Sequence, residues 1–235
     1  MQLFYAKELK SDIYTLPEDE SRHVVKVLRL GAGDSVFLTD GQGTLLRAAI
    51  VQPDVRGCVV KVEERNVQPE PTFQLRIAVA PTKNESRIEM FAEKATEAGI
   101  AAITPIRCDH SERTILRTDR LEKIVVSAMK QSLRLIKPRV DSLVRLDDVI
   151  ISATEPQRFI CHCEGAERVS LQQAMRPGVS TLILIGPEGD FSPREVALAL
   201  EYGFRPITLG NSRLRTETAA LAATFYSYFI NQPLQ

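Results

Sequence analysis

The chain has 235 residues, 44% of them hydrophobic, and its 30 lysines and arginines balance its 30 aspartates and glutamates. This size and composition suffice for a substantial core in one large domain or two modest ones. No run of about 18 apolar residues occurs, and the amino terminus has no long apolar segment, so we expect a soluble cytoplasmic protein without a membrane partner.

From residue 1 to about 70, short alternating hydrophobic runs (35–38, 45–51 and 57–62) are separated by closely spaced turn sequences. This pattern predicts a small β-barrel or sandwich with one short helix near 18–28. The sequence Gln-Pro-Glu-Pro at 68–71 indicates a linker, because each proline stiffens the chain and lacks a backbone donor. We therefore expect one domain over 1–70 and a second over 71–235.

After Pro71, strands alternate with helices. Strands are expected at 74–80, 102–107, 157–163, 181–186 and 205–209. A helix near 86–99 carries an apolar stripe that ends at Gly99, and another near 119–135 carries a similar stripe. The alternation predicts an α/β domain with a mostly parallel sheet covered on both faces.

The four cysteines, at 58, 108, 161 and 163, do not form the pattern of a small disulfide scaffold and favour a reducing compartment. Cys161, His162 and Cys163, together with Cys108 and His110, raise the alternative of a zinc site. Alternate residues of a strand point to opposite faces, however, and structural zinc pairs usually have about two to four residues between cysteines. We therefore expect no metal and interpret these residues as buried strand ends.

Two strand–loop–helix joins dominate the carboxy-terminal third. The strand ending at Ile185 enters a tight Gly-Pro loop, after which Ser192, Pro193 and Glu195 fit N-cap, N1 and N3 of a capping box. About twenty residues later, a strand ending at Leu209 is followed by Gly210 and an alanine-rich helix. Two such loops can close on one ligand, although a Gly-Pro-Glu-Gly loop is also typical of a plain connection. Neither a dinucleotide fingerprint nor a P-loop sequence is present.

The segments Gly186-Pro187-Glu188-Gly189 and Leu209 to Ala219 resemble the paired signature of the RsmE family, the rRNA uridine-N3 methyltransferases of the SPOUT superfamily. Similar blocks occur at 23–29, 94–99, 103–106, 111–113 and 131–132, so the resemblance covers nearly the whole chain. It implies a PUA-like β-barrel that binds RNA over 1–70. It also implies an α/β methyltransferase domain over 71–235 whose parallel sheet is knotted as a trefoil, a feature that periodicity does not reveal.

The resemblance further implies methyl transfer from S-adenosylmethionine to N3 of a uridine in small-subunit (16S) rRNA, either free or within an assembled 30S subunit. The expected cofactor-binding residues lie on the glycine loops and on a third segment that includes Glu164; they are His162, Cys163, Leu184, Gly186, Pro187, Glu188, Gly189, Leu209, Gly210, Leu214 and Thr218. The reaction also needs removal of the N3 proton and extrusion of the base.

Arginines can stabilise charge that develops on the uridine, and a carboxylate can accept its proton. The catalytic candidates are Arg213, Arg215, Glu217, Gln131 and Arg134. The alternative for Thr216 to Thr218 is a simple helix cap with an acid in the first turn. Around Gln131 this chain has Lys130 and Leu133 where family members commonly have an acid and a glycine.

Residues 107–139 contain nine lysines and arginines against four acids, which suits a phosphate backbone or, alternatively, a solvated surface. The expected RNA-binding residues are Arg113 from this block and Arg22, His23, Lys26 and Arg29, which recur at helical spacing. The resemblance also implies a homodimer through the α/β domain. The last helix, which is apolar on more than one stripe at Leu221, Phe225, Tyr228 and Phe229, would then be partly buried between subunits; the alternative is complete burial within one subunit.

Two rival functions remain open from the sequence. A noncatalytic RNA-binding protein would bind RNA without affinity for S-adenosylmethionine. An unrelated small-molecule enzyme would bind a nucleotide such as ATP or NAD and ignore RNA.

Overall fold

The computed structural model describes residues 2–7, 9, 11–163 and 168–232. The chain forms two compact units, Met1–Glu70 with Val126–Lys137 and Pro71–Val125 with Pro138–Gln235. The segment 126–137, which lies beyond the expected boundary at residue 70, thus belongs to the first unit.

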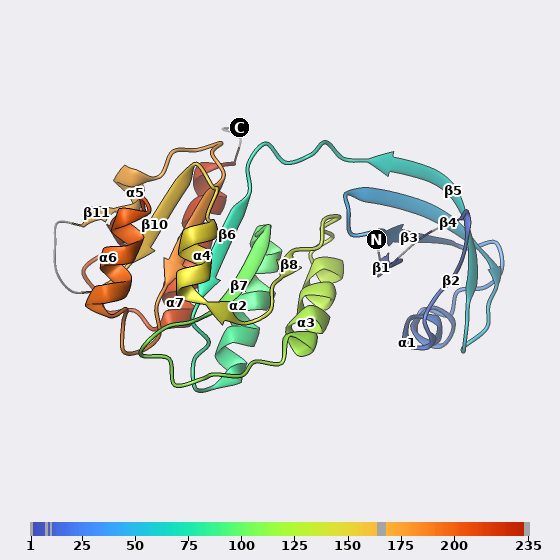
Figure 1. Ribbon diagram of the computed structural model, residues 1–235. Helices are drawn as coiled ribbons and strands as arrows, with labels where there is room; N and C mark the ends of the chain where they lie inside the picture. Colours follow the sequence, from blue (N-terminus) through green and yellow to red (C-terminus); the bar gives the residue numbers. More distant parts are fainter. Residues whose placement is uncertain (1, 8, 10, 164–167, 233–235) are drawn as a thin grey trace. The chain divides into compact units, whose positions relative to one another are not determined.

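The first unit contains a curled five-stranded sheet in the order β1-β3-β4-β5-β2 (Figure 1). The long strands pair antiparallel, whereas β1 joins β3 in parallel. Two register shifts between β4 and β5 are typical of the bulges that bend such sheets. Apolar residues on alternate strand positions form one core, so the predicted small β-domain is confirmed. The strands are β1 (Leu3–Tyr5), β2 (Ile13–Thr15), β3 (Ser35–Thr39), β4 (Thr44–Gln52) and β5 (Val59–Val67).

The helix expected near 18–28 consists of two elements, α1 (Glu18–Arg22) and a π-helix, η1 (His23–Val27). The backbone N–H of Leu28 donates to the carbonyl of His23 at 2.9 Å. A π-turn holds more residues than an α-turn, so side chains do not repeat at α-helical spacing. Arg29 lies beyond the helix with φ of 57°. The prediction that Arg22, His23, Lys26 and Arg29 share one α-helical face is therefore wrong.

Leu135 and Lys137, which follow α3 (Thr118–Gln131), bind the turn between β3 and β4 of the first unit. The carbonyl of Leu135 accepts hydrogen bonds from Thr39 Oγ1 and from the N–H of Gly43, at 2.9 and 3.0 Å, and the N–H of Lys137 donates to Gly41. These bonds draw the chain away from helical geometry. Helix α3 accordingly ends earlier than the expected position near 135, and Leu133 takes a left-handed φ of 57°.

The second unit contains a sheet in the order β11-β13-β10-β12-β6-β7-β8, with β9 also paired to β7, and every pair is parallel. The five predicted strands are present, whereas the two-residue strands β8, β9 and β11 were not predicted. The strands are β6 (Leu75–Val79), β7 (Ala102–Arg107), β8 (Arg139–Val140), β9 (Val144–Arg145), β10 (Gln157–Cys161), β11 (Val169–Ser170), β12 (Thr181–Ile185) and β13 (Arg205–Thr208).

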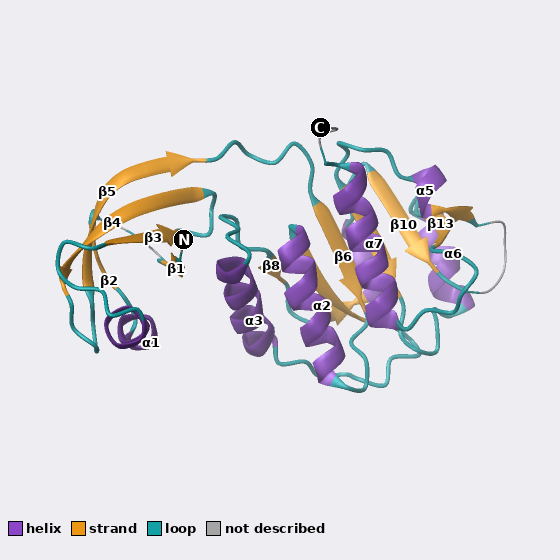
Figure 2. Ribbon diagram, turned by 180° about the vertical axis from the view of Figure 1, so that it is seen from behind, coloured by secondary structure: helices purple, strands orange, loops and turns teal. Residues whose placement is uncertain are grey.

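Helices cover both faces of this sheet (Figures 1 and 2). Ile77 and Val79 of β6 pack in a core with α2 (Glu85–Ala98), α5 (Leu171–Ala174) and α7 (Thr216–Ile230). Ala78, on the opposite face, packs in a second core with α4 (Leu146–Ser152) and α6 (Pro193–Glu201). The predicted α/β fold is confirmed; the trefoil knot stays a prediction.

The helix ends follow the sequence signals. Asn84 caps α2 by accepting the N–H of Ser86, and Gly99 ends it with φ of 84°. The predicted capping box of α6 is present, because Ser192 and Glu195 exchange side-chain and backbone bonds. The stripe of α2 is buried as expected, at Ile88, Phe91, Ala92, Ala95 and Ala98.

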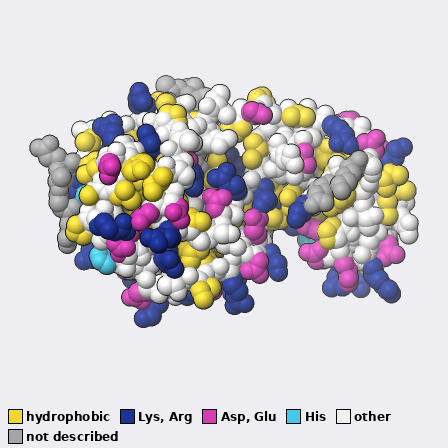
Figure 3. Space-filling view, viewed as in Figure 1, with side chains coloured by type: hydrophobic (Ala, Val, Ile, Leu, Met, Phe, Trp, Pro, Cys, Tyr) yellow, Lys and Arg dark blue, Asp and Glu magenta, His cyan; other side chains and the backbone are white. Residues whose placement is uncertain are grey.

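Several cations of the 107–139 block are neutralised by acids from other segments. Arg113 pairs with Glu85 at 2.5 Å, and Arg120 pairs with Glu89 at 2.7 Å, both on α2. Lysines and arginines are also interspersed with acids on the face seen in Figure 3. The excess positive charge of this block is therefore smaller in the folded structure than in the sequence, because acids from other segments lie beside its cations.

Candidate active site at the carboxyl edge of the parallel sheet

Three neighbouring strands, β13, β10 and β12, end at one level. Cys161, the last residue of β10, lies beside Ile185 of β12 and Ile207 of β13. Because the three strands are parallel, the segments that follow them leave the same edge of the sheet, where α/β proteins bind ligands. All the expected cofactor-binding residues except Leu184 and Thr218 belong to these three segments. Leu184 lies within β12, and its side chain is fully buried in the core beneath α4 and α6.

The loop after β12 is closely packed. Gly186 and Pro187 are buried, whereas Glu188 and Gly189 are exposed. A Cβ atom at Gly186 would lie 3.1 Å from the Phe191 ring, and one at Gly189 would lie 3.1 Å from the Cβ of His110. Close packing therefore favours glycine at both positions.

The loop after β13 has a different constraint. Gly210 has φ of 129°, a conformation that residues with a side chain rarely adopt, and open space surrounds its Cα. Leu209 and Leu214 on either side are half-buried against the core of α2 and α7. The backbone of this loop is therefore exposed at Gly210, while Leu209 and Leu214 supply apolar surface beside it. This arrangement suits a flat heterocycle such as adenine.

The start of α7 is fastened to the loop after β12. Thr216 Oγ1 donates to the carbonyl of Gly186 at 3.0 Å in a buried bond. The next residue, Glu217, is 6% exposed, and its Oε1 lies 3.6 Å from Nε of Arg87. Thr218 is exposed. Arg213 and Arg215 are also exposed and form no ion pair with any residue that the structure describes.

Two buried polar atoms, Nε2 of His162 and Oε2 of Glu217, have no hydrogen-bond partner among the residues that the structure describes. Leaving a buried polar atom unpaired costs about 1–3 kcal/mol, so natural folds retain few of them and often near functional sites. Together with the exposed backbone at Gly210, these atoms fit a ligand that has both polar groups and a flat apolar ring. The residues present thus fit S-adenosylmethionine.

The first residue after β10, His162, is held in place by burial and by a hydrogen bond to its carbonyl. His162 is buried, and its carbonyl accepts a bond from Nη1 of Arg168 at 2.7 Å. Cys163 is exposed, contrary to the expectation of buried strand ends, because β10 stops at Cys161. Burial raises the pKa of the Cys161 thiol to about 12. The predicted residue Glu164 lies outside the described residues.

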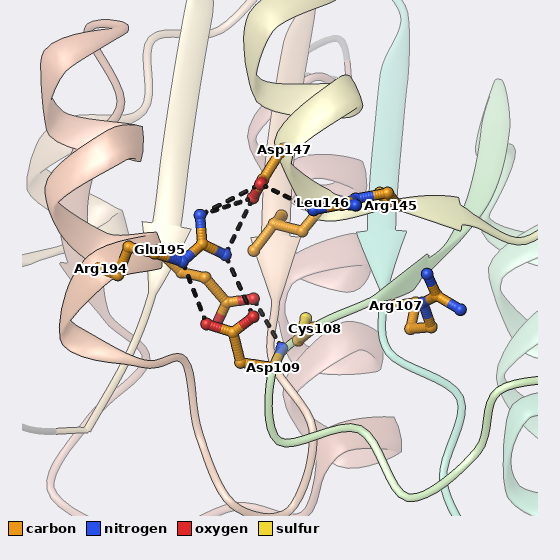
Figure 4. A pocket seen from close by; sticks show the side chains of 8 residues that line it. All are labelled: Arg107, Cys108, Asp109, Arg145, Leu146, Asp147, Arg194 and Glu195. Carbon is orange, nitrogen blue, oxygen red and sulfur yellow. Dashed lines mark hydrogen bonds and ion pairs between the residues drawn. The ribbon is translucent and has the colours of Figure 1, made fainter.

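A charged network supports the loop after β12 from the side of α4 and α6 (Figure 4). Arg194 forms ion pairs with Asp109 and Asp147, each at 3.1 Å, and Ser192 Oγ donates to Asp109 at 2.6 Å. The bonds from Arg194 and Ser192 hold the pKa of Asp109 below its ordinary value. Asp109, Asp147 and Arg194 line a pocket of about 140 Å³ whose lining includes none of the predicted cofactor residues. Sequence reasoning missed this network, because Asp109 and Arg194 lie far apart in the chain and each resembles an ordinary surface charge.

The catalytic candidates are divided between the two units. Arg213, Arg215 and Glu217 belong to the second unit, whereas Gln131 and Arg134 belong to the first. Gln131 is exposed and Arg134 is half-buried. Within the second unit, the three candidates Arg213, Arg215 and Glu217 lie at the start of α7.

The expected RNA-binding residues differ in their availability. Lys26 and Arg29 are exposed without an ion pair among the described residues, whereas Arg22 pairs with Glu18 at 2.6 Å. His23 packs edge-on against Phe4, and its Nε2 lies 3.2 Å from Nε2 of Gln2. In the second unit, Arg113 donates to the carbonyls of Thr82 and Lys83 in addition to its pair with Glu85. Lys26 and Arg29 are therefore the most accessible cations of this set.

Within the described part of the chain, no helix is long and apolar enough to cross a membrane. The same residues include no group of three or more histidines, cysteines or acids that could hold a metal ion.

Comparison with known proteins matched two family models. The RNA methyltransferase domain matches residues 68–226, and the RNA methyltransferase PUA domain matches residues 16–63. A curated relative, ribosomal RNA small subunit methyltransferase E of Mycobacterium bovis, is 30% identical over 94% of this chain and 88% of its own length.

Two crystal structures are similar over the whole chain. A probable rRNA-methyltransferase from Porphyromonas gingivalis is 40% identical, with a TM-score of 0.93 and 98% of each chain covered. A ribosomal RNA small subunit methyltransferase E from Neisseria gonorrhoeae, bound to S-adenosyl methionine, is 26% identical, with a TM-score of 0.83 and 98% of each chain covered. With a methyltransferase model that spans more than half of its length, this chain belongs to the RNA methyltransferase family, in the RsmE group that its two glycine loops had indicated.

Proposed function

We propose that this protein transfers the methyl group of S-adenosylmethionine to N3 of a uridine in small-subunit ribosomal RNA. The observation that carries the proposal is the common edge of β10, β12 and β13, from which both glycine loops leave the sheet. His162, directly after β10, and Glu217, next to the residue that bonds to Gly186, each have a buried polar atom without a partner among the described residues. Family membership supports the substrate class.

The cofactor, when bound, supplies an electrophilic methyl group on its sulfonium. We propose that backbone groups of the Gly186–Gly189 and Leu209–Leu214 segments bind the adenine and that Leu209 and Leu214 contact its faces. His162, Cys163 and Thr218 complete the pocket. Glu217 is buried, its Oε1 lies 3.6 Å from Arg87 Nε, and its Oε2 has no partner among the described residues, so Oε2 would be available to a donor group of the ligand.

For the transfer itself, Arg215 is the main candidate to stabilise charge that develops on the uridine, and Arg213 is the second. Both are exposed and have no acidic partner among the described residues, so they are available to a substrate. Glu217 is the candidate proton acceptor. Gln131 and Arg134, in the first unit, are further candidates.

The first unit would position the RNA through its PUA-like sheet, and the second would hold the cofactor and perform the transfer. Lys26 and Arg29, with Arg22, His23 and Arg113, are the proposed phosphate contacts. The substrate would be either free 16S rRNA or an assembled 30S subunit in the cytoplasm. A PUA domain match over residues 16–63 supports the division.

We also propose a homodimer that buries one side of α7. Phe229 is 68% exposed and contacts Phe225 with tilted rings and Tyr228 edge-on, which leaves an aromatic cluster in contact with water. Light scattering at micromolar concentration should give twice the chain mass, and Phe229→Asp should reduce it to the chain mass. A monomeric wild-type protein would contradict the dimer.

The function is tested by incubating the purified protein with S-adenosylmethionine and small-subunit rRNA, and separately with 30S subunits, under single-turnover conditions. Mass analysis of the nucleosides should find N3-methyluridine, and Arg215→Ala should lower the transfer rate more than the RNA affinity. Another methylated nucleoside would contradict the assignment. Binding of RNA without S-adenosylmethionine would favour the noncatalytic alternative, and binding of ATP or NAD instead would favour the small-molecule enzyme.

A further inference from the structure

Asp190 follows the glycine loop directly and has an unusual backbone conformation. Its φ is 61°, in the left-handed region that costs conformational energy for a residue with a side chain. Such strain persists where the side chain gains enough from its surroundings to offset it. The contacts of the Asp190 side chain should therefore show what offsets this strain.

The carboxylate of Asp190 joins two of the three segments at the sheet edge. Its Oδ2 accepts the backbone N–H of Cys163 at 2.7 Å, and its Oδ1 accepts the N–H of Phe191 at 2.9 Å. Cys163 follows β10, whereas Asp190 and Phe191 follow β12. One side chain thus fixes the distance between the backbones of two proposed cofactor-binding segments. Bonds to a charged acceptor are stronger than bonds between neutral groups.

His110 holds the same turn from the other side. Its Nδ1 lies 3.0 Å from the carbonyl of Gly189 and 3.1 Å from that of Asp190. Because both carbonyls only accept hydrogen bonds, Nδ1 carries the proton in this arrangement. The side chain of His110 also lies against Gly189, so the turn has little space in which to move.

We infer that Asp190 is a positioning residue that sets the spacing of the His162–Cys163 and Gly186–Gly189 segments for cofactor binding. This inference rests on the proposed function. Both carboxylate oxygens already accept backbone N–H groups, which indicates that Asp190 acts through the two segments rather than by contact with the ligand. The left-handed turn is what allows its side chain to face Cys163 while the turn's carbonyls face His110.

The test uses Asp190→Gly, because glycine accepts the backbone conformation and removes only the carboxylate. Asp190→Asn keeps the side chain's size but has a single acceptor oxygen. The matched control is Asp54→Gly, which removes a loop aspartate that accepts a backbone N–H, that of Arg56, in the first unit. For each protein we would measure the calorimetric affinity for S-adenosylmethionine, the affinity for rRNA, the unfolding midpoint and the hydrogen exchange of the Cys163 amide without ligand.

We expect Asp190→Gly to weaken S-adenosylmethionine binding by roughly tenfold or more, the effect of losing charged hydrogen bonds. Its Cys163 amide should exchange faster, while rRNA affinity and the unfolding midpoint stay near the wild-type values. Asp190→Asn should fall in between, and Asp54→Gly should leave the S-adenosylmethionine affinity unchanged.

Unchanged cofactor affinity or unchanged Cys163 exchange in Asp190→Gly would overturn the inference. A parallel loss of cofactor affinity, RNA affinity and unfolding midpoint would also overturn it, because that pattern indicates only a structural role. If the wild-type protein itself did not bind S-adenosylmethionine, the proposed function would fail first, and this result is distinct from the others.

Discussion

Gly189 and Gly210 occur in similar loops for different physical reasons. At Gly189 a side chain would meet His110, whereas at Gly210 there is room for a side chain but the backbone is in a region reserved largely for glycine. Substitution at Gly210 therefore acts through the shape of the backbone alone. This makes Gly210 the cleaner position for testing the loop.

We expect Gly210→Ala to destabilise the loop by about 1–3 kcal/mol and to weaken S-adenosylmethionine binding. Gly178→Ala is the matched control, because Gly178 also has a positive φ, 70°, and open space, but it precedes β12 and lies at the opposite end of that strand. Both variants should unfold at lower temperature, and only Gly210→Ala should lose cofactor affinity in calorimetry. Equal cofactor affinity in the two variants would argue against a site at this loop.

Asp109 provides a pH-dependent contribution to stability. Arg194 and Ser192 hold the pKa of its carboxyl below the ordinary value, so the ionised form stabilises the folded state. This contribution is complete above about pH 4, the range of an unperturbed aspartate, and is lost as the pH falls through the lowered pKa.

Asp109→Asn should therefore lower the urea midpoint at pH 7, and the difference from wild type should shrink as the pH falls below about 4. Asp148→Asn is the control, since Asp148 is an exposed acid of α4 whose side chain makes no ion pair with the described residues. A difference for Asp109→Asn that stayed constant from pH 7 to about pH 3 would show that the carboxyl's charge is not responsible.

A buried side-chain bond, from Thr216 to the carbonyl of Gly186, joins the first residue of α7 to the residue after β12. The bond links two elements that are well separated in sequence. The sequence predicted both elements and the capping box of α6, because hydrophobic periodicity and capping are local signals. It did not predict this bond or the ion pairs of Arg194, since their partners are set by the packing of distant segments.

Thr216→Val keeps the shape of the side chain and leaves the Gly186 carbonyl without this partner, which should cost about 1–3 kcal/mol in urea unfolding. Thr224→Val is the control within the same helix: Thr224 is equally buried, but its hydroxyl bonds to Ala220, a carbonyl of α7 itself. Only Thr216→Val should also weaken S-adenosylmethionine binding. A larger loss of stability in Thr224→Val would contradict the role given to the joining bond.

Hydrophobic periodicity also gave wrong predictions where contacts with other segments determine the backbone conformation. The segment 23–27 resembles an ordinary helix in sequence but forms a π-helix, and α3 stops at Gln131 because the following residues bond to the sheet of the first unit. The carboxy-terminal loops were predictable because glycine, proline and capping residues mark them. The partners of their polar side chains were not, because several come from segments that resemble plain surface helices.

At the scale of the whole molecule, the net charge is zero, but RNA binding depends on where the lysines and arginines lie and whether acids already pair with them. Acids on α2 pair with Arg113 and Arg120, so part of the block at 107–139 is committed to the fold. In the first unit, Lys26 and Arg29 have no such partners among the described residues. The proposed division of work between the units therefore depends most on these two cations.

The double variant Lys26→Ala with Arg29→Ala should weaken rRNA binding and reduce the slope of log affinity against log salt by roughly one unit for each phosphate that the protein no longer neutralises. Its affinity for S-adenosylmethionine should not change, because the cofactor residues lie in the second unit. Arg56→Ala with Lys61→Ala is the matched control, since it removes the same charge from exposed positions of the first unit. Filter binding over a salt series, with calorimetry for the cofactor, measures both effects. If the two double variants lowered rRNA affinity equally, the effect would come from net charge, and the segment 23–29 would not be the surface that positions the RNA.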